Sequence, residues 1–201
     1  MERNRIRESW DILSDTYANS RNPDGNDAAL ITACFGDLPP DAVVLDIGCG
    51  DGRRTLSNLT HVQSVGLDIS RSGLVLAADA VPSAKLLQGE MTTLPLKNDC
   101  VDAITAYHSV FHVPRTEHPD VYREFARVLA PGGGLLMTVG TGRYQTVRSN
   151  WLNSGRSMFF STPGKQQTIE QLKTAGFEVQ WERVVDDPLG SSALFVFATV
   201  A

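Results

Sequence analysis

The stretch "VVLDIGCGDGRRT", residues 43–55, decides the fold of this chain. Apart from Asp46, its first five residues are apolar, which is typical of a strand buried on both faces of a parallel sheet. Gly48, Gly50 and Gly52 follow at once, and glycines allow a ligand to approach the backbone closely. A strand that runs into a glycine-rich loop predicts an α/β fold with a ligand site at the strand end. The residues around the loop indicate which ligand it holds.

Length and composition fit one soluble domain. The 201 residues are enough for a substantial core, so we expect a single domain over residues 1–201. A formal net charge of -5 argues against a broad nucleic-acid surface. No apolar run reaches the roughly 18 residues that span a bilayer, so we expect no membrane association and a cytoplasmic location.

The three cysteines do not predict a metal site. Cys34, Cys49 and Cys100 are widely spaced and lack the short spacings of metal ligands. We interpret them as structural thiols and expect no bound metal.

Strand-like and helix-like segments alternate along the chain, which indicates a mainly parallel sheet. The last two expected strands are joined by a connection too short for a helical crossover, so they should be antiparallel. The expected strands are 43–47, 62–67, 84–88, 101–107, 134–139, 177–184 and 193–200. The expected helices are 70–81, capped by Ser70, 119–129, and one with a capping box that begins at Thr168 and closes at Gly176.

Two segments stand outside this alternation. Residues 1–40 precede the first strand, and residues 140–167 follow the fifth strand. Ligands of open α/β sheets lie beyond the carboxyl ends of the strands, where the second segment begins. This insertion therefore either covers a ligand or packs as a surface elaboration.

The charges beside the glycine loop favour a ligand without phosphate. The dinucleotide fingerprint G-x-G-x-x-G, started at Gly48, requires a glycine at position 53, where the chain has Arg53. The carboxylate of Asp46 would repel a pyrophosphate at close range and attract an ammonium or a sulfonium. Both features disfavour a nicotinamide-dependent oxidoreductase.

Residues 43–52 resemble the first motif of class I S-adenosylmethionine-dependent methyltransferases of the small-molecule, type 11-like kind, and the resemblance extends over about residues 43–139. The segments "VGLDIS" (65–70), "QGEMTTLPLKNDCVDAITAYHSVFHV" (88–113) and "YREFARVLAPGGGLLMTV" (122–139) resemble the motifs that follow in the family. The resemblance implies a Rossmann-like seven-stranded sheet in the order 3-2-1-4-5-7-6, with strand 7 antiparallel and helices on both faces. It also implies S-adenosylmethionine as cofactor and S-adenosylhomocysteine as product.

The resemblance assigns roles around this cofactor. Asp46 would take the methionine ammonium, indirectly or through water, and Asp68 would accept hydrogen bonds from both ribose hydroxyls. Glu90, where the family often has aspartate, would contact the adenine side together with Met91. The residues expected at the cofactor are Tyr17, Arg21, Asp46, Gly48, Cys49, Gly50, Asp68, Ile69, Glu90, Met91 and Tyr107.

The segment "SWDILSDTYANSR", residues 9–21, resembles the helical cap of small-molecule members of the family. Residues 1–40 would then form an N-terminal helical cap, and the insertion at 140–167 would lie near the acceptor site. Tyr17 is the candidate for the methionine carboxylate, with Arg21 behind it. Core packing is the alternative role for Tyr17.

The methyl acceptor is expected to be a small molecule that is methylated at oxygen or nitrogen, by a monomer or homodimer. His108 is the candidate general base and His112 a weaker one, a structural histidine being the alternative for His112. An RNA or protein methyltransferase is the second hypothesis, although "YHSV" (107–110) stands where base-amino methyltransferases often carry Asn/Asp-Pro-Pro-aromatic. A non-catalytic S-adenosylmethionine-binding protein is the third.

Overall fold

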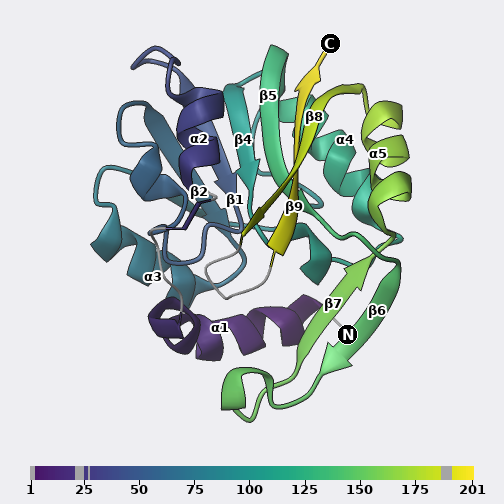
Figure 1. Ribbon diagram of the computed structural model, residues 1–201. Helices are drawn as coiled ribbons and strands as arrows, with labels where there is room; N and C mark the ends of the chain where they lie inside the picture. The colour runs from purple at the N-terminus through teal and green to yellow at the C-terminus, as the bar shows by residue number, and fades with distance from the viewer. Residues whose placement is uncertain (1–2, 21–24, 27, 187–191) are drawn as a thin grey trace.

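The fold is an open, twisted sheet with helices on both faces (Figure 1). It is seen in a computed structural model that describes residues 3–20, 25–26, 28–186 and 192–201. The seven strands are β1 (Val43–Ile47), β2 (Gln63–Asp68), β3 (Lys85–Gln88), β4 (Val101–Ala106), β5 (Leu129–Val139), β8 (Phe177–Asp186) and β9 (Ser192–Val200). They lie in the order β3-β2-β1-β4-β5-β9-β8. The first five strands in this order pair in parallel, and β9 is antiparallel to both neighbours.

The predicted strand order is confirmed, and only the numbers of the last two strands differ. A two-stranded hairpin, β6 (Tyr144–Arg148) with β7 (Met158–Thr162), precedes them in the chain. The predicted strands 6 and 7 are therefore β8 and β9, and the seventh strand is antiparallel as expected.

The central strands are buried on both faces, as their continuous apolar sequence predicts. Because successive side chains point to opposite faces, Val44 and Leu45 enter separate cores. Leu45 packs with Phe125 and Leu172 of two helices on one face, and Val44 packs with Ile31 of a helix on the other. The helices are α2 (Ala28–Phe35), α3 (Arg71–Ala80), α4 (His118–Val128) and α5 (Lys165–Thr174), with short 3-10 turns η1 (Leu56–Asn58), η2 (Val110–His112) and η3 (Trp151–Asn153).

One predicted helix start is confirmed and one is wrong. Ser70 caps α3, and its hydroxyl accepts a hydrogen bond from the Gly73 backbone N–H at 3.1 Å. The α5 helix begins at Lys165, so Thr168 lies inside it and is buried. Gly164 precedes the helix with φ of 92°, a conformation that glycine adopts without strain, and this allows the earlier start.

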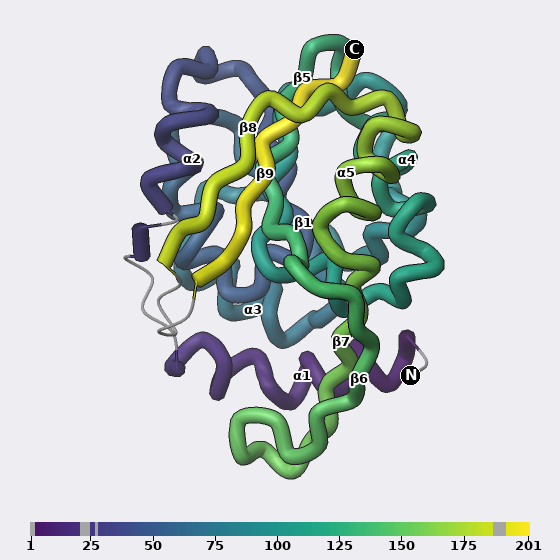
Figure 2. The backbone as a smooth tube through the Cα atoms, turned by 45° about the vertical axis from the view of Figure 1, so that its right-hand side comes forward, coloured from purple at the N-terminus to yellow at the C-terminus, as the bar shows by residue number. Residues whose placement is uncertain are grey.

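The two segments outside the sheet pack against each other. The helix α1 (Arg3–Ser20) lies beyond the carboxyl ends of the parallel strands, beside the β6–β7 hairpin (Figures 1 and 2). Ile6 and Leu13 of α1 form a cluster with Met158, Phe159 and Phe160 of β7. A hydrogen bond also joins them, from the Ser9 hydroxyl to the Ser157 carbonyl oxygen, at 3.1 Å. Together, α1 and the hairpin form a cover over this end of the sheet.

Candidate active site

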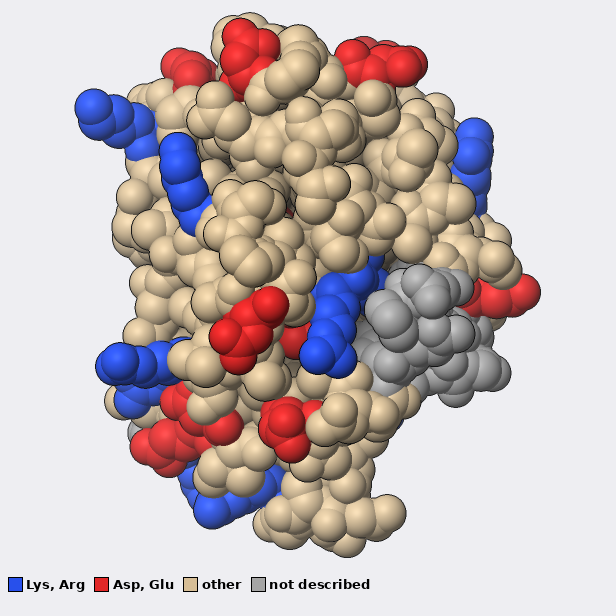
Figure 3. Space-filling view, turned by 90° about the vertical axis from the view of Figure 1, so that its left-hand side faces the viewer, with Lys and Arg blue, Asp and Glu red and all other residues tan. Residues whose placement is uncertain are grey.

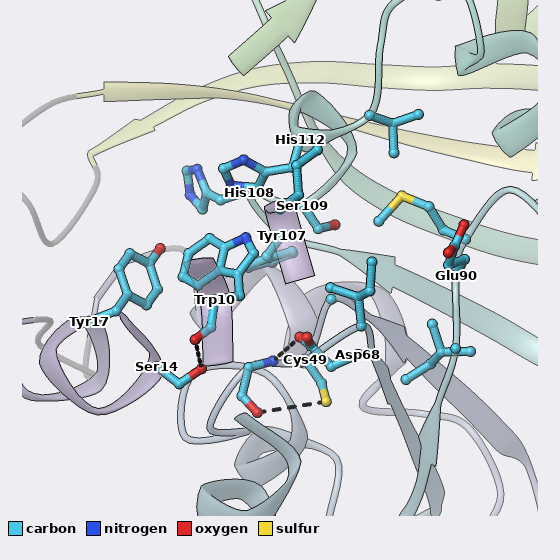
Figure 4. A pocket seen from close by; sticks show the side chains of 18 of the residues that line it. Trp10, Ser14, Tyr17, Cys49, Asp68, Glu90, Tyr107, His108, Ser109 and His112 are labelled. Carbon is cyan, nitrogen blue, oxygen red and sulfur yellow. Dashed lines mark hydrogen bonds between the residues drawn. The ribbon is translucent and has the colours of Figure 1, made fainter. Parts of the chain in front are cut away.

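A pocket lies between the sheet and α1, at the carboxyl ends of β1, β2, β3 and β4 (Figure 4). Most of the residues predicted at the site line it. They are Tyr17, Gly48, Cys49, Gly50, Asp68, Ile69, Glu90, Met91, Tyr107, His108 and His112. Arg21 lies outside the described residues, and Asp46 is buried behind the lining.

The glycine loop after β1 has a backbone that only glycine adopts easily. Gly48 and Gly50 have φ of 73° and 54°, in the left-handed region. A Cβ on Gly48 would lie 2.4 Å from the Cβ of Ser109, so the loop also needs glycine to pack against the end of β4. A Cβ on Gly50 would meet nothing within 4 Å. The loop therefore leaves open space at Gly50, on the pocket lining.

The carboxylate of Asp46 holds this loop from behind. It is 1% exposed and accepts hydrogen bonds from the hydroxyls of Thr55 and Thr105, the second at 2.7 Å. Burial raises the pKa of Asp46 to about 7, although both hydroxyl donors oppose this rise. Since Thr55 lines the pocket and Asp46 does not, Asp46 can act on a ligand only through its neighbours.

The carboxylate of Asp68 lies in the pocket at the end of β2. One oxygen accepts the Gly50 backbone N–H at 2.8 Å, and the other accepts the Ser70 N–H at 2.7 Å. Burial raises the pKa of Asp68, while these two backbone donors oppose the rise. Each carboxylate oxygen has a second lone pair, so Asp68 can still accept from two hydroxyls of a ligand.

On the opposite side of the pocket, Glu90 forms an ion pair with α1. The Arg3 guanidinium lies 2.8 Å from Glu90 and also pairs with Glu117, which precedes α4. These ion pairs connect the N-terminal end of α1 to the loop after β3 and to the loop before α4. Glu90 lies well apart from the aromatic side chains on the far wall (Figure 4).

The far wall is aromatic. The rings of Trp10 and Tyr17, both on α1, meet edge to face with centroids 5.1 Å apart. Trp10 also meets the His112 ring at 5.1 Å and the Trp151 ring at 5.4 Å. Tyr17, Trp10, His108 and His112 gather on one side of the pocket, away from Glu90 (Figure 4).

The two predicted histidines differ in their setting. The Nδ1 atom of His112 lies 2.8 Å from the Phe159 carbonyl oxygen, and burial lowers the pKa of His112 to about 4. His108 has a φ of 52°, which is strained for a residue with a side chain, and its backbone N–H donates to the Thr138 hydroxyl. Both side chains line the pocket.

Sequence reasoning missed two arginines of the pocket. Arg54 lines it and is 9% exposed; Arg53, which drew notice as the missing glycine, also lines it, but its side chain is 55% exposed. Arg3 lines it from the start of α1. A basic residue directly after a ligand-binding loop could have signalled Arg54. Nothing in the local sequence links Arg3 to Glu90.

Comparison with known proteins identifies the domain. Residues 44–133 match the family model described as "Methyltransferase domain". The residues matched contain the glycine loop, Asp68 and Glu90. Over these residues the chain is therefore similar to methyltransferase domains. Its solved neighbours include a Methanosarcina mazei protein titled a SAM-dependent methyltransferase, with a TM-score of 0.73, 20% identity and coverage of 84% of this chain and 96% of that one.

Curated relatives of this chain include methyltransferases whose names state different acceptors, and one whose name states none. The methyltransferase GfsG of Streptomyces halstedii is 38% identical over 49% of this chain and 38% of its own length. Squalene methyltransferase 1 of Botryococcus braunii is 34% identical, over 80% and 45%. A tRNA (carboxymethyluridine(34)-5-O)-methyltransferase of Arabidopsis thaliana is 24% identical, over 95% and 44%. The chain thus spans less than half the length of these relatives.

S-adenosylmethionine is the cofactor of this class of domain, and the pocket suits it. Asp68 offers acceptors for ribose hydroxyls, and the open space at Gly50 provides room beside the loop. The buried Arg54 would place a positive charge within reach of the carboxylate at the methionine end. Within the described residues, no group of three or more His, Cys, Asp and Glu could hold a metal ion, and no helix could span a membrane.

Proposed function

We propose that the protein transfers a methyl group from S-adenosylmethionine to a small-molecule acceptor, at oxygen or nitrogen. The observation that carries this proposal is the aromatic far wall of the pocket, closed over by α1. A pocket covered by a helix suits a small molecule better than a polymer that must enter from solvent. Aromatic rings suit an acceptor with apolar surface.

The lining divides into two ends with separate tasks. The cofactor, when bound, supplies an electrophilic methyl group. Asp68 would bind the ribose of the cofactor, and the loop at Gly50 would lie beside the bound cofactor. Arg54 would bind the carboxylate of its methionine portion. The aromatic wall would hold the acceptor, and Trp10 and Tyr17 would exclude water from it. Positioning of this kind accounts for much of the catalysis available to a methyl transfer.

An RNA acceptor is the second hypothesis, favoured by the alignment of the tRNA methyltransferase over 95% of this chain. Against it stand the net charge of -5 and the distribution of charge. On the face drawn in Figure 3, Lys and Arg side chains are interspersed with Asp and Glu rather than gathered into one patch. A phosphate backbone would find no continuous basic track on that face.

The fate of labelled methyl groups tests the proposal. The protein is incubated with methyl-tritiated S-adenosylmethionine and a cell extract that is then separated into small molecules, RNA and protein. We expect label in the small-molecule fraction. Label in RNA or protein would support the second hypothesis instead, and binding of S-adenosylhomocysteine without any transfer would indicate a non-catalytic binding protein.

A further inference from the structure

His112 differs from the other carbonyl-bound histidines in the nitrogen that it uses. His61 and His118 each place Nε2 against a carbonyl oxygen, of Phe35 at 3.1 Å and of Val113 at 3.0 Å. His112 places Nδ1 against the Phe159 carbonyl, at 2.8 Å. A carbonyl oxygen only accepts hydrogen bonds, so Nδ1 of His112 must carry the proton. Its Nε2 is then a bare acceptor.

The position of the His112 ring is fixed on several sides. It follows β4 on η2, and the Phe159 carbonyl belongs to β7, so the hydrogen bond joins the sheet to the hairpin. The rings of Trp10, Phe111 and Phe160 lie 4.8 to 5.1 Å from it. Packing of this kind prevents the ring from turning to exchange its two nitrogens. His112 lines the same pocket as Trp10 and Tyr17.

The surroundings of His112 are apolar, which matters for its charge. Burial lowers the pKa of its imidazole to about 4, so the ring is neutral at physiological pH. The carboxylates that line the pocket come from the strand ends and not from the aromatic wall: Asp51 and Glu90 follow β1 and β3, and Asp68 is the last residue of β2. A neutral acceptor nitrogen among aromatic rings can bind an O–H or N–H group, but it repels the lone pairs of a carboxylate.

We propose that His112 selects the methyl acceptor: its Nε2 accepts a hydrogen bond from an uncharged hydroxyl or N–H group on an otherwise apolar, ring-sized molecule. This inference rests on the proposed function and narrows its acceptor class. It also ranks His112 above His108 as the residue that touches the reacting group, because its ring orientation and its tautomer are both fixed by the fold.

The tautomer is tested first, without any ligand, by nitrogen-15 NMR of the four histidines. We expect the His112 spectrum to show a protonated Nδ1 and a bare Nε2, and His61 and His118 to show the opposite pattern. We also expect the His112 ring to stay neutral at pH 6. A protonated Nε2 on His112, or a charged ring at that pH, overturns the inference.

Binding is tested with three probes of similar size: phenol, toluene and benzoate. Each is titrated into protein saturated with S-adenosylhomocysteine. Phenol should bind roughly 3- to 10-fold more tightly than toluene, the effect of one hydrogen bond, and should shift the Nε2 signal of His112. Benzoate should bind more weakly than both. Equal binding of phenol and benzoate, or no binding of phenol, contradicts the proposal.

Two variants distinguish the roles that the proposal gives to the two ring nitrogens of His112. His112→Asn keeps a donor at the Nδ1 position for the Phe159 carbonyl and removes Nε2, so phenol should bind no better than toluene. His112→Gln keeps a polar atom near the Nε2 position and should retain part of the preference. S-adenosylhomocysteine affinity should be unchanged in both. Undiminished phenol preference in His112→Asn refutes the role of His112, whereas failure of S-adenosylhomocysteine to bind the wild type refutes the proposed function.

Discussion

The glycines of the loop after β1 are required for different reasons. Replacing each one should therefore lower the stability of the fold by a different amount. A side chain at Gly48 would meet Ser109 at 2.4 Å and would also adopt a left-handed backbone, whereas one at Gly50 has open space and meets only the backbone penalty. Gly142 has neither constraint. These three positions form a graded series within one chain.

We expect Gly48→Ala to lower the free energy of unfolding more than Gly50→Ala, which should cost about 1 kcal/mol. Gly142→Ala should have little effect. Urea denaturation of the three variants measures this order. Equal losses at Gly48 and Gly50 would show that contact with Ser109 does not constrain the loop.

Asp68 has a role that can be measured on the cofactor product alone. Asp68→Asn should weaken S-adenosylhomocysteine binding roughly 10- to 100-fold, because charge-assisted hydrogen bonds to the ribose are lost. Asp79→Asn changes an exposed carboxylate on α3 and serves as the control. Calorimetric titration measures the S-adenosylhomocysteine affinity of both variants. Equal affinities of Asp68→Asn and Asp79→Asn would show that Asp68 does not bind the cofactor.

The raised pKa of Asp46 predicts that its contribution to the stability of the fold falls as the pH rises. Its folded pKa of about 7 lies above its ordinary value of 3.8, so between these values the folded protein holds a proton that the unfolded chain has released. Stability from this group is therefore lost as the pH rises through that window. Asp46→Asn should be more stable relative to the wild type at pH 8 than at pH 5, measured by urea denaturation. Parallel curves for the two proteins would contradict the buried, protonated carboxyl.

Among the elements, α1 is attached to the rest of the molecule by its apolar cluster with β7 and by polar contacts along the helix. Arg3 pairs with Glu90 and Glu117, and Asp11 accepts from the Ser70 hydroxyl at 2.9 Å and from the Ser72 N–H at 3.2 Å. Because exposed ion pairs contribute at most about 1 kcal/mol, the Arg3 end is the weakest attachment of this cover.

We expect Arg3→Ala to accelerate hydrogen exchange in α1 and to raise the dissociation rate of S-adenosylhomocysteine a few-fold, with little change in global stability. Arg7→Ala, on the exposed side of the same helix, is the matched control. Stopped-flow displacement measures the rate. An unchanged rate in Arg3→Ala would show that α1 does not limit exit from the pocket.

The elements of the sheet could be predicted from sequence, whereas the hairpin could not. Strands β1 and β4 and the second half of β5 are mostly buried, and their sequences are mostly apolar. All five residues of β6 are exposed, so "YQTVR" lacks the alternation that signals a strand. Strand β6 is stabilised by pairing with β7. The side chains of β7 pack on α1, which precedes it in the chain by more than a hundred residues.

For the molecule as a whole, the order of motifs along the chain predicted both the topology and the position of the pocket. The carboxyl ends of parallel strands meet at one edge, so the loop after β1, Asp68 and Glu90 had to lie near each other. The aromatic far wall was less accessible to prediction, because Trp10, His112 and Phe159 come from three distant segments. Their contacts form only when α1 and the hairpin pack against each other and against the end of the sheet.

Calorimetric titration of the wild-type protein with S-adenosylhomocysteine and with NAD, under identical conditions, tests the ligand that the glycine loop selects. We expect one S-adenosylhomocysteine bound per chain and no detectable heat with NAD, because the loop lacks the third dinucleotide glycine and is backed by Asp46. Binding of NAD as tight as, or tighter than, that of S-adenosylhomocysteine would contradict the assignment of this pocket to methyl transfer.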